Sequence, residues 1–89
     1  MPYIGPEAKI KLAADLDAGL GPETAGELVF ILTQLCTAYI HRHGHGFAIL
    51  NNVIGALECT KLEFYRRVAA PYEDRKCAEN GDVYLKEAL

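Results

Sequence analysis

Two apolar patterns with helical spacing constrain the fold of this 89-residue chain more than any other feature. From Leu28 to Ile40, apolar side chains recur every three or four residues, as they do on one side of an α-helix. A second pattern with the same spacing runs from Phe47 to Val68. The sequence therefore predicts an all-α protein built around two long helices.

Capping residues mark the boundaries of the first long helix. Thr24 and Glu27 have the spacing of a capping box, which predicts a helix start. Gly44 follows the apolar pattern and suits the positive φ angle at which helices often end.

The second long helix is predicted to begin near Gly46 or Phe47 and to run to about Ala70. Gly55 in its interior costs about 1 kcal/mol of helix propensity relative to alanine. A close approach of another backbone at Gly55-Ala56 would offset that cost.

Prolines and glycines bound two shorter helices. Pro6 suits the first position of a helix that reaches about Leu16. Pro71 predicts a break or a kink in the second long helix, after which a fourth helix ends at Gly81. Periodicity leaves the conformation of residues 82–89 undecided.

The length of the chain bears on how it reaches stability. A domain this small buries only about 60–65% of its unfolded surface, so stability alone is marginal. We therefore expect residues 1–89 to form one domain, a compact bundle of about four helices completed by self-association. A dimer is the favoured oligomer, with the second long helix in or beside the interface.

Composition argues against several classes of partner. Nine Lys and Arg against 12 Asp and Glu give a net charge of −3, which disfavours binding to nucleic acid. The longest apolar stretch is interrupted by polar residues and too short to span a bilayer, and the N-terminal residues do not have the pattern of a secretory signal. Three cysteines without a CxxC pair favour reduced thiols. These features predict a cytoplasmic protein.

Basic and aromatic residues gather around Pro71. Residues 61–76 hold five basic and three acidic side chains, whereas residues 1–35 hold two basic and five acidic ones. Arginine binds phosphate oxygens in a bidentate manner, and tyrosine stacks on bases. The candidate ligand or interface residues are Lys61, Tyr65, Arg66, Arg67, Tyr72, Arg75, Lys76 and Asn80. Three interpretations stay open: salt bridges within the chain, an interface between subunits, and a site for an anionic, nucleotide-like small molecule.

The segment His41–His45 suggests a metal site as a minor alternative, because three imidazoles lie close together. Gly44 interrupts the helical spacing of His41 and His45, and Arg42 repels a cation. A solvated helix end is the preferred interpretation, and no cofactor or metal is predicted. Because the chain contains no serine, no P-loop and no GxGxxG motif, we expect a non-catalytic protein.

The chain also resembles a known family. The resemblance rests on the opening residues 1–4, on Ile54–Glu58 and Lys61–Arg67, and on Pro71–Asp74 followed by Asn80–Tyr84. These segments are similar to a family of short uncharacterised proteins, carried as a domain of unknown function, from phages, prophages and environmental microbes. The resemblance implies no activity. The many polar residues in these segments favour an interface or a ligand over packing alone.

Overall fold

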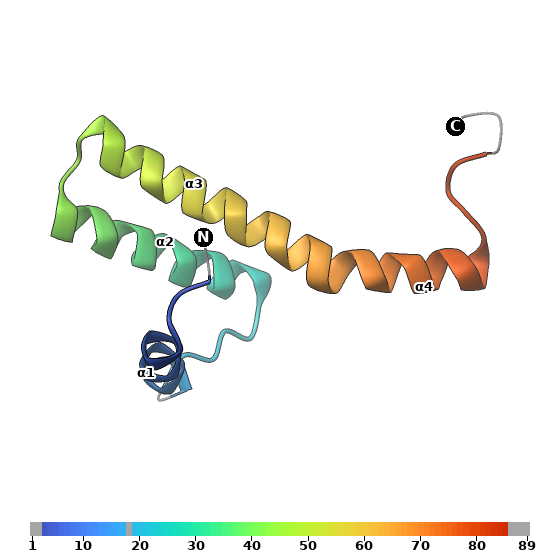
Figure 1. The fold of residues 1–89 in the computed structure, drawn as a ribbon, viewed down its shortest axis with the longest axis horizontal. Coiled ribbons are helices and arrows are strands. Elements are labelled where there is room, and N and C mark those ends of the chain that lie inside the picture. Colours follow the sequence, from blue (N-terminus) through green and yellow to red (C-terminus); the bar gives the residue numbers. More distant parts are fainter. Residues whose placement is uncertain (1–2, 18, 86–89) are drawn as a thin grey trace.

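The computed structural model describes residues 3–17 and 19–85, and every regular element within them is helical. Helix α1 spans Pro6–Asp17 and α2 spans Ala25–His43. Helix α3 (Phe47–Phe64) continues through a π-helical turn, η1 (Tyr65–Ala69), into α4 (Ala70–Asn80). The all-α prediction is confirmed, but the described residues form three helical rods because α3, η1 and α4 are one continuous helix (Figure 1).

The predicted capping residues bound α2. The Thr24 hydroxyl accepts a hydrogen bond from the Glu27 N–H at 3.1 Å, while a Glu27 carboxylate oxygen accepts from the Glu23 N–H at 3.0 Å. Gly44 ends the helix with φ +110° and ψ 174°, a conformation open essentially to glycine alone. The Gly44 N–H donates to the Ile40 carbonyl at 2.7 Å, which satisfies one terminal carbonyl of α2.

The helix does not break at Pro71, so the prediction of a separate fourth helix is wrong. The alternative prediction, a kink, agrees with the change of direction between α3 and α4 in Figure 1. A proline within a regular α-helix lacks one hydrogen bond and clashes with the preceding turn. Immediately before Pro71, the Ala70 N–H donates to the carbonyl of Tyr65, five residues back, instead of four. This wider π-helical turn changes the hydrogen-bond register where the ring would collide, so the helix continues through the proline.

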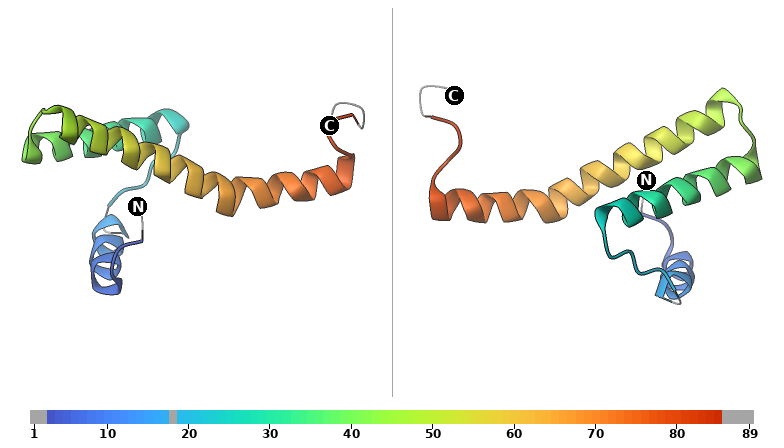
Figure 2. Two further views of the ribbon diagram at one scale, coloured as in Figure 1. Left: turned by 45° about the horizontal axis from the view of Figure 1, so that its top comes forward. Right: turned by 180° about the vertical axis from the view of Figure 1, so that it is seen from behind.

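The helices are arranged as an open structure. Helices α2 and α3 lie side by side and antiparallel, while α1 stands apart from them and α4 extends beyond the hairpin (Figures 1 and 2). The structure measures 51 × 32 × 29 Å, with a radius of gyration of 17.6 Å. A compact chain of this length would have a radius of gyration of about 12 Å. The prediction of a compact four-helix bundle is therefore wrong for the single chain.

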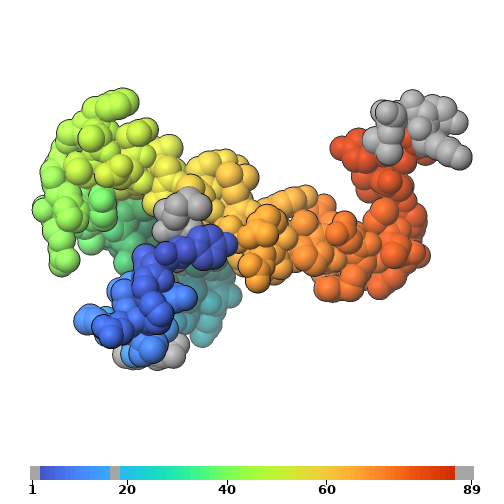
Figure 3. All heavy atoms as spheres, viewed as in Figure 1, coloured from blue at the N-terminus to red at the C-terminus, as the bar shows by residue number. Residues whose placement is uncertain are grey.

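No side chain among the described residues is buried. The accessible surface is 7870 Å², against about 5,200 Å² for a compact monomer of this mass. Figure 3 shows α4 and the residues after it projecting as an arm from the rest of the molecule. The apolar sides of α2 and α3, which the sequence analysis placed in a core, thus remain largely in contact with solvent.

The expected close approach at Gly55 is not found. A Cβ atom added there would meet no heavy atom within 4 Å. Gly55 lies on an open side of α3, so the propensity cost of this glycine has no compensation within the described chain.

Candidate functional site

The structure separates the eight predicted site residues into two groups. Four of them line one concave surface beside α4, and the other four lie outside it. This concave surface, called here the C-terminal hollow, has a volume of about 520 Å³. The predicted residues that line the hollow are Tyr65, Tyr72, Lys76 and Asn80; those outside it are Lys61, Arg66, Arg67 and Arg75.

The hollow forms because the chain turns back after α4. Gly81, with φ +90°, ends the helix, and its N–H donates to the Cys77 carbonyl at 2.8 Å. An Asp82 carboxylate oxygen then accepts a hydrogen bond from the Tyr84 N–H at 3.0 Å, which holds a tight turn. Residues 81–84 thereby form one wall of the hollow opposite α4.

The charge of the hollow differs from that of the predicted basic cluster. Its lining contains three carboxylates, from Glu73, Asp74 and Asp82, and one ammonium group, from Lys76. Hydrogen bonding to Glu73, together with the negative charge of Glu73, raises the pKa of Tyr65. The hollow is therefore lined by acidic and aromatic groups, an environment that favours cations over anions.

Basic residues near the hollow contact neighbours on the same helix. The Arg75 guanidinium and the Lys76 ammonium lie 5.8 and 5.6 Å from the centre of the Tyr72 ring, within cation–π distance. Lys76 also pairs with Glu79 at 3.3 Å. Lys61 pairs with Glu58 at 3.3 Å on α3. Arg67 makes no hydrogen bond or ion pair with the described residues. Salt bridges thus form within the described chain, but each joins neighbours three or four residues apart, and none ties α4 to α3 as the sequence had suggested.

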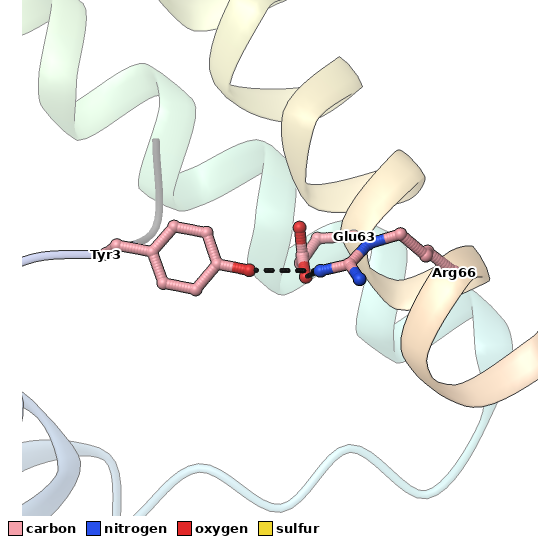
Figure 4. A network of polar contacts seen from close by, with 3 residues as sticks. All are labelled: Tyr3, Glu63 and Arg66. Atoms are coloured by element: carbon pink, nitrogen blue, oxygen red, sulfur yellow. Dashed lines mark hydrogen bonds and ion pairs between the residues drawn. The ribbon is translucent and has the colours of Figure 1, made fainter.

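Arg66 takes part in a contact that spans almost the whole sequence. It pairs with Glu63 one turn earlier and lies 3.4 Å from the Tyr3 hydroxyl (Figure 4). Hydrogen bonding by Tyr3, with further contributions from Arg66 and Arg67, lowers the pKa of Glu63. Neither Arg66 nor Arg67 lines the C-terminal hollow. Tyr3 was not predicted as a partner, because no local spacing relates it to Arg66, whereas Glu63 and Arg66 have the i,i+3 spacing of neighbours on one helix face.

A second concave surface lies between α2 and α3 and is mainly apolar. We call it the hairpin groove; its volume is about 290 Å³. Its lining residues are Leu32, Leu35, Cys36 and Tyr39 from α2 and Asn52, Val53, Ala56, Leu57 and Thr60 from α3. The Thr60 hydroxyl donates to the Ala56 carbonyl at 2.7 Å, which satisfies one of its few polar groups within α3.

Beside the groove, α3 carries a row of side chains at alternating spacings of three and four residues. We call this row the α3 seam; it comprises Phe47, Leu50, Ile54, Leu57, Lys61 and Phe64. Ile54 is 65% exposed and Phe64 62% exposed, so α2 covers neither of them. Most of these residues were predicted from the sequence as apolar positions of a long helix that lies in or beside a dimer interface.

The histidines and cysteines form no further site in the structure. The rings of His41 and His45 lie 6.0 Å apart, and His43 packs on Tyr39 at 4.5 Å. Within residues 3–17 and 19–85, no three metal-ligating side chains form a cluster that could hold a metal ion. Cys36, Cys59 and Cys77 are unpaired, as expected; the first two are half-buried and Cys77 is exposed.

One family of proteins has a sequence pattern that matches residues 1–83, and it is described as a domain of unknown function, DUF6899. The chain belongs to the DUF6899 family. The predicted resemblance to a family of unknown function is thus confirmed. Comparisons with curated proteins and with solved structures gave no match. The DUF6899 match covers both the Tyr3 contact and the hairpin. In the described part of this DUF6899 protein, no helix is long and apolar enough to cross a membrane.

Proposed function

We propose that this DUF6899 protein is a non-catalytic, homo-oligomeric interaction module, with a dimer as the favoured assembly. One observation carries the proposal: the described residues include no buried side chain. Isolated helices of 12 to 19 residues are marginally stable in water, so helices α1 to α3 need packing from another surface. A second copy of the chain provides such a surface.

The exposed area supports association on the scale of an obligate oligomer. The chain exposes about 2,700 Å² more than a compact monomer of equal mass. A standard interface buries only about 800 Å² on each partner. The excess is large enough for burial of both the hairpin groove and the α3 seam. It supports an oligomer in which these surfaces form the missing core.

Other features support a non-catalytic role in a reducing compartment. The chain contains no serine, so a serine nucleophile is excluded. Three unpaired cysteines suit a cytoplasmic location, where thiols stay reduced. The family resemblance also suggests that the protein is associated with phages. A phage protein that acts only by binding needs no catalytic residues and can be small.

Measurement of mass in solution tests the proposal. Light scattering at roughly tens of micromolar should give at least about twice 9.8 kDa. Leu35→Lys should abolish the oligomer, because it places a charge in the hairpin groove. Phe30→Lys is the matched control: Phe30 is similarly exposed but lies roughly 140° around α2 from Leu35. A wild-type mass of 9.8 kDa with full helical content would overturn the proposal.

Capture of an anionic, nucleotide-like ligand is the second candidate. It is favoured by the meeting of Tyr65, Tyr72, Lys76 and Asn80 at one hollow, where rings could stack on a base. The three carboxylates of the hollow oppose a phosphate, and this weighs in favour of the interaction module. Calorimetry with a panel of cyclic and linear nucleotides tests this candidate. Binding that is lost in Lys76→Ala while the oligomer persists would support capture, and no heat with any nucleotide would exclude those ligands.

A further inference from the structure

The spacing of the α3 seam is that of a two-helix coiled coil. Its six members recur at three and four residues along α3, from Phe47 to Phe64, and Leu57 is the fourth of them. Side chains with this repeat form a narrow stripe that packs knobs-into-holes against a second helix. Within one chain, α2 occupies a different side of α3, so nothing described covers the stripe.

We propose that two copies pair through their α3 seams in antiparallel orientation, with Leu57 at the two-fold axis, and that the two hairpins form a four-helix bundle. This inference rests on the proposed function and specifies its partner and register. The occupant is a second copy because the excess exposed area of each chain, about 2,700 Å², exceeds what a stable dimer needs. Because the seam has the same three- and four-residue spacing along the length of α3, the seams of two copies can pack against each other.

Lys61 decides the orientation. In a parallel pair in register, Lys61 would face the same residue of the second copy, and two ammonium groups would meet in an apolar seam. A polar residue at one such position is known to fix register in coiled coils. In the antiparallel pair, Lys61 instead falls beside Ile54 of the second copy. The lysine stem then packs on an apolar side chain.

Glu58 also favours the antiparallel orientation. It lies one residue from the proposed axis and already pairs with Lys61 of its own chain at 3.3 Å. Near the two-fold axis, two Glu58 carboxylates and two Lys61 ammonium groups would form a cluster with no net charge. Antiparallel pairing therefore balances the charges of the seam, whereas parallel pairing leaves the two lysines opposed.

The hairpin groove extends the contact to α2. Leu57 belongs both to the seam and to the groove, so a helix seated on the seam also lies along the groove. From α2, Leu32, Leu35 and Tyr39 line the groove with the same three- and four-residue spacing. Two hairpins placed face to face thus bury four helices, the packing of a four-helix bundle. The two α4 arms would then project from opposite ends.

Distances between spin labels test the orientation. The background variant has alanine at Cys36, Cys59 and Cys77, with helical content and mass compared with those of the wild type. Ala48 lies on α3 nine residues before Leu57, so labels on two Ala48→Cys chains should be roughly 27 Å apart along the bundle. In a parallel pair these labels would be roughly 10–20 Å apart.

A mixed sample gives the complementary short distance. Arg67 lies ten residues after Leu57, so Ala48→Cys of one copy and Arg67→Cys of the other should differ by only about 2 Å along the axis. A short distance in the mixed sample, with a long one in each single variant, supports the antiparallel pair. An oligomer with a short distance between like positions would overturn the inference but retain the proposed function. A monomeric mass without any distance between chains would overturn both.

Discussion

The hydroxyl oxygen of Tyr3 lies 3.4 Å from a guanidinium nitrogen of Arg66, 63 residues further along the chain. The contact joins the segment before α1 to Arg66 in the π-helical turn η1, between α3 and α4 (Figure 4). Arg66 is held in turn by Glu63. Because α1 stands apart from the other helices, this exposed polar network is a main tie between the N-terminal segment and the hairpin.

Tyr3→Phe should raise the pKa of Glu63 toward its ordinary value, because the variant removes the hydroxyl that hydrogen bonds to this network. The pKa of Glu63 is lowered in the folded chain, so its ionisation adds stability above the unfolded pKa. That stability is lost as the pH falls through the folded pKa. Carbon-detected NMR titration of the Glu63 carboxyl group measures the change.

Tyr84→Phe is the matched control for Tyr3→Phe, because Tyr84 lies at the C-terminal hollow and not in this network. It should leave the Glu63 titration unchanged. An identical Glu63 titration in wild type and Tyr3→Phe would show that Tyr3 does not contact the pair in solution.

Two glycines should respond in opposite ways to alanine. At Gly55 a new Cβ meets open space within an α-helix, so Gly55→Ala should increase the free energy of unfolding by about 1 kcal/mol. Gly44 has φ +110°, which an alanine adopts only with strain. Gly44→Ala should therefore lower the free energy of unfolding by about 1 kcal/mol or more. Thermal unfolding at one fixed protein concentration measures both. If Gly55→Ala instead destabilises the protein, this would indicate that another backbone packs against Gly55 in the oligomer.

Local chemistry made much of the helical structure predictable. Thr24, Glu27 and Gly44 act through contacts within one turn, so their spacing alone indicates where α2 begins and ends. Pro71 misled the prediction, because the compensation for its missing N–H lies in a π-helical turn one residue before it. No local sequence pattern predicts a π-helical turn.

The location of the core was not predictable for a different reason. The spacing of Phe47, Ile54 and Phe64 shows that one side of α3 is apolar, but an apolar stripe has the same spacing whether the helix that covers it comes from the same chain or from another. Which residues of the basic cluster share one surface was also not predictable. Neighbours in sequence such as Tyr65 and Arg66 lie on different sides of the rod, and only Tyr65 lines the hollow. The acidic lining depends on the turn at Gly81 and Asp82, which periodicity did not resolve.

Glu73→Gln should lower the pKa of Tyr65 toward its ordinary value of about 10. In the wild type, the Glu73 carboxylate hydrogen bonds to the phenol and repels a phenolate, so the pKa of Tyr65 is raised in the folded chain. This interaction therefore adds stability below the unfolded pKa, and the contribution is lost as the pH rises through the folded pKa. NMR titration of ring-labelled tyrosine should show Tyr65 ionising at higher pH in the wild type than in the variant.

The matched control is Glu79→Gln, which removes a carboxylate from the same helix but not from the hollow. This variant should leave the Tyr65 titration unchanged. Equal Tyr65 titrations in wild type and Glu73→Gln would show that the two side chains do not meet at the hollow.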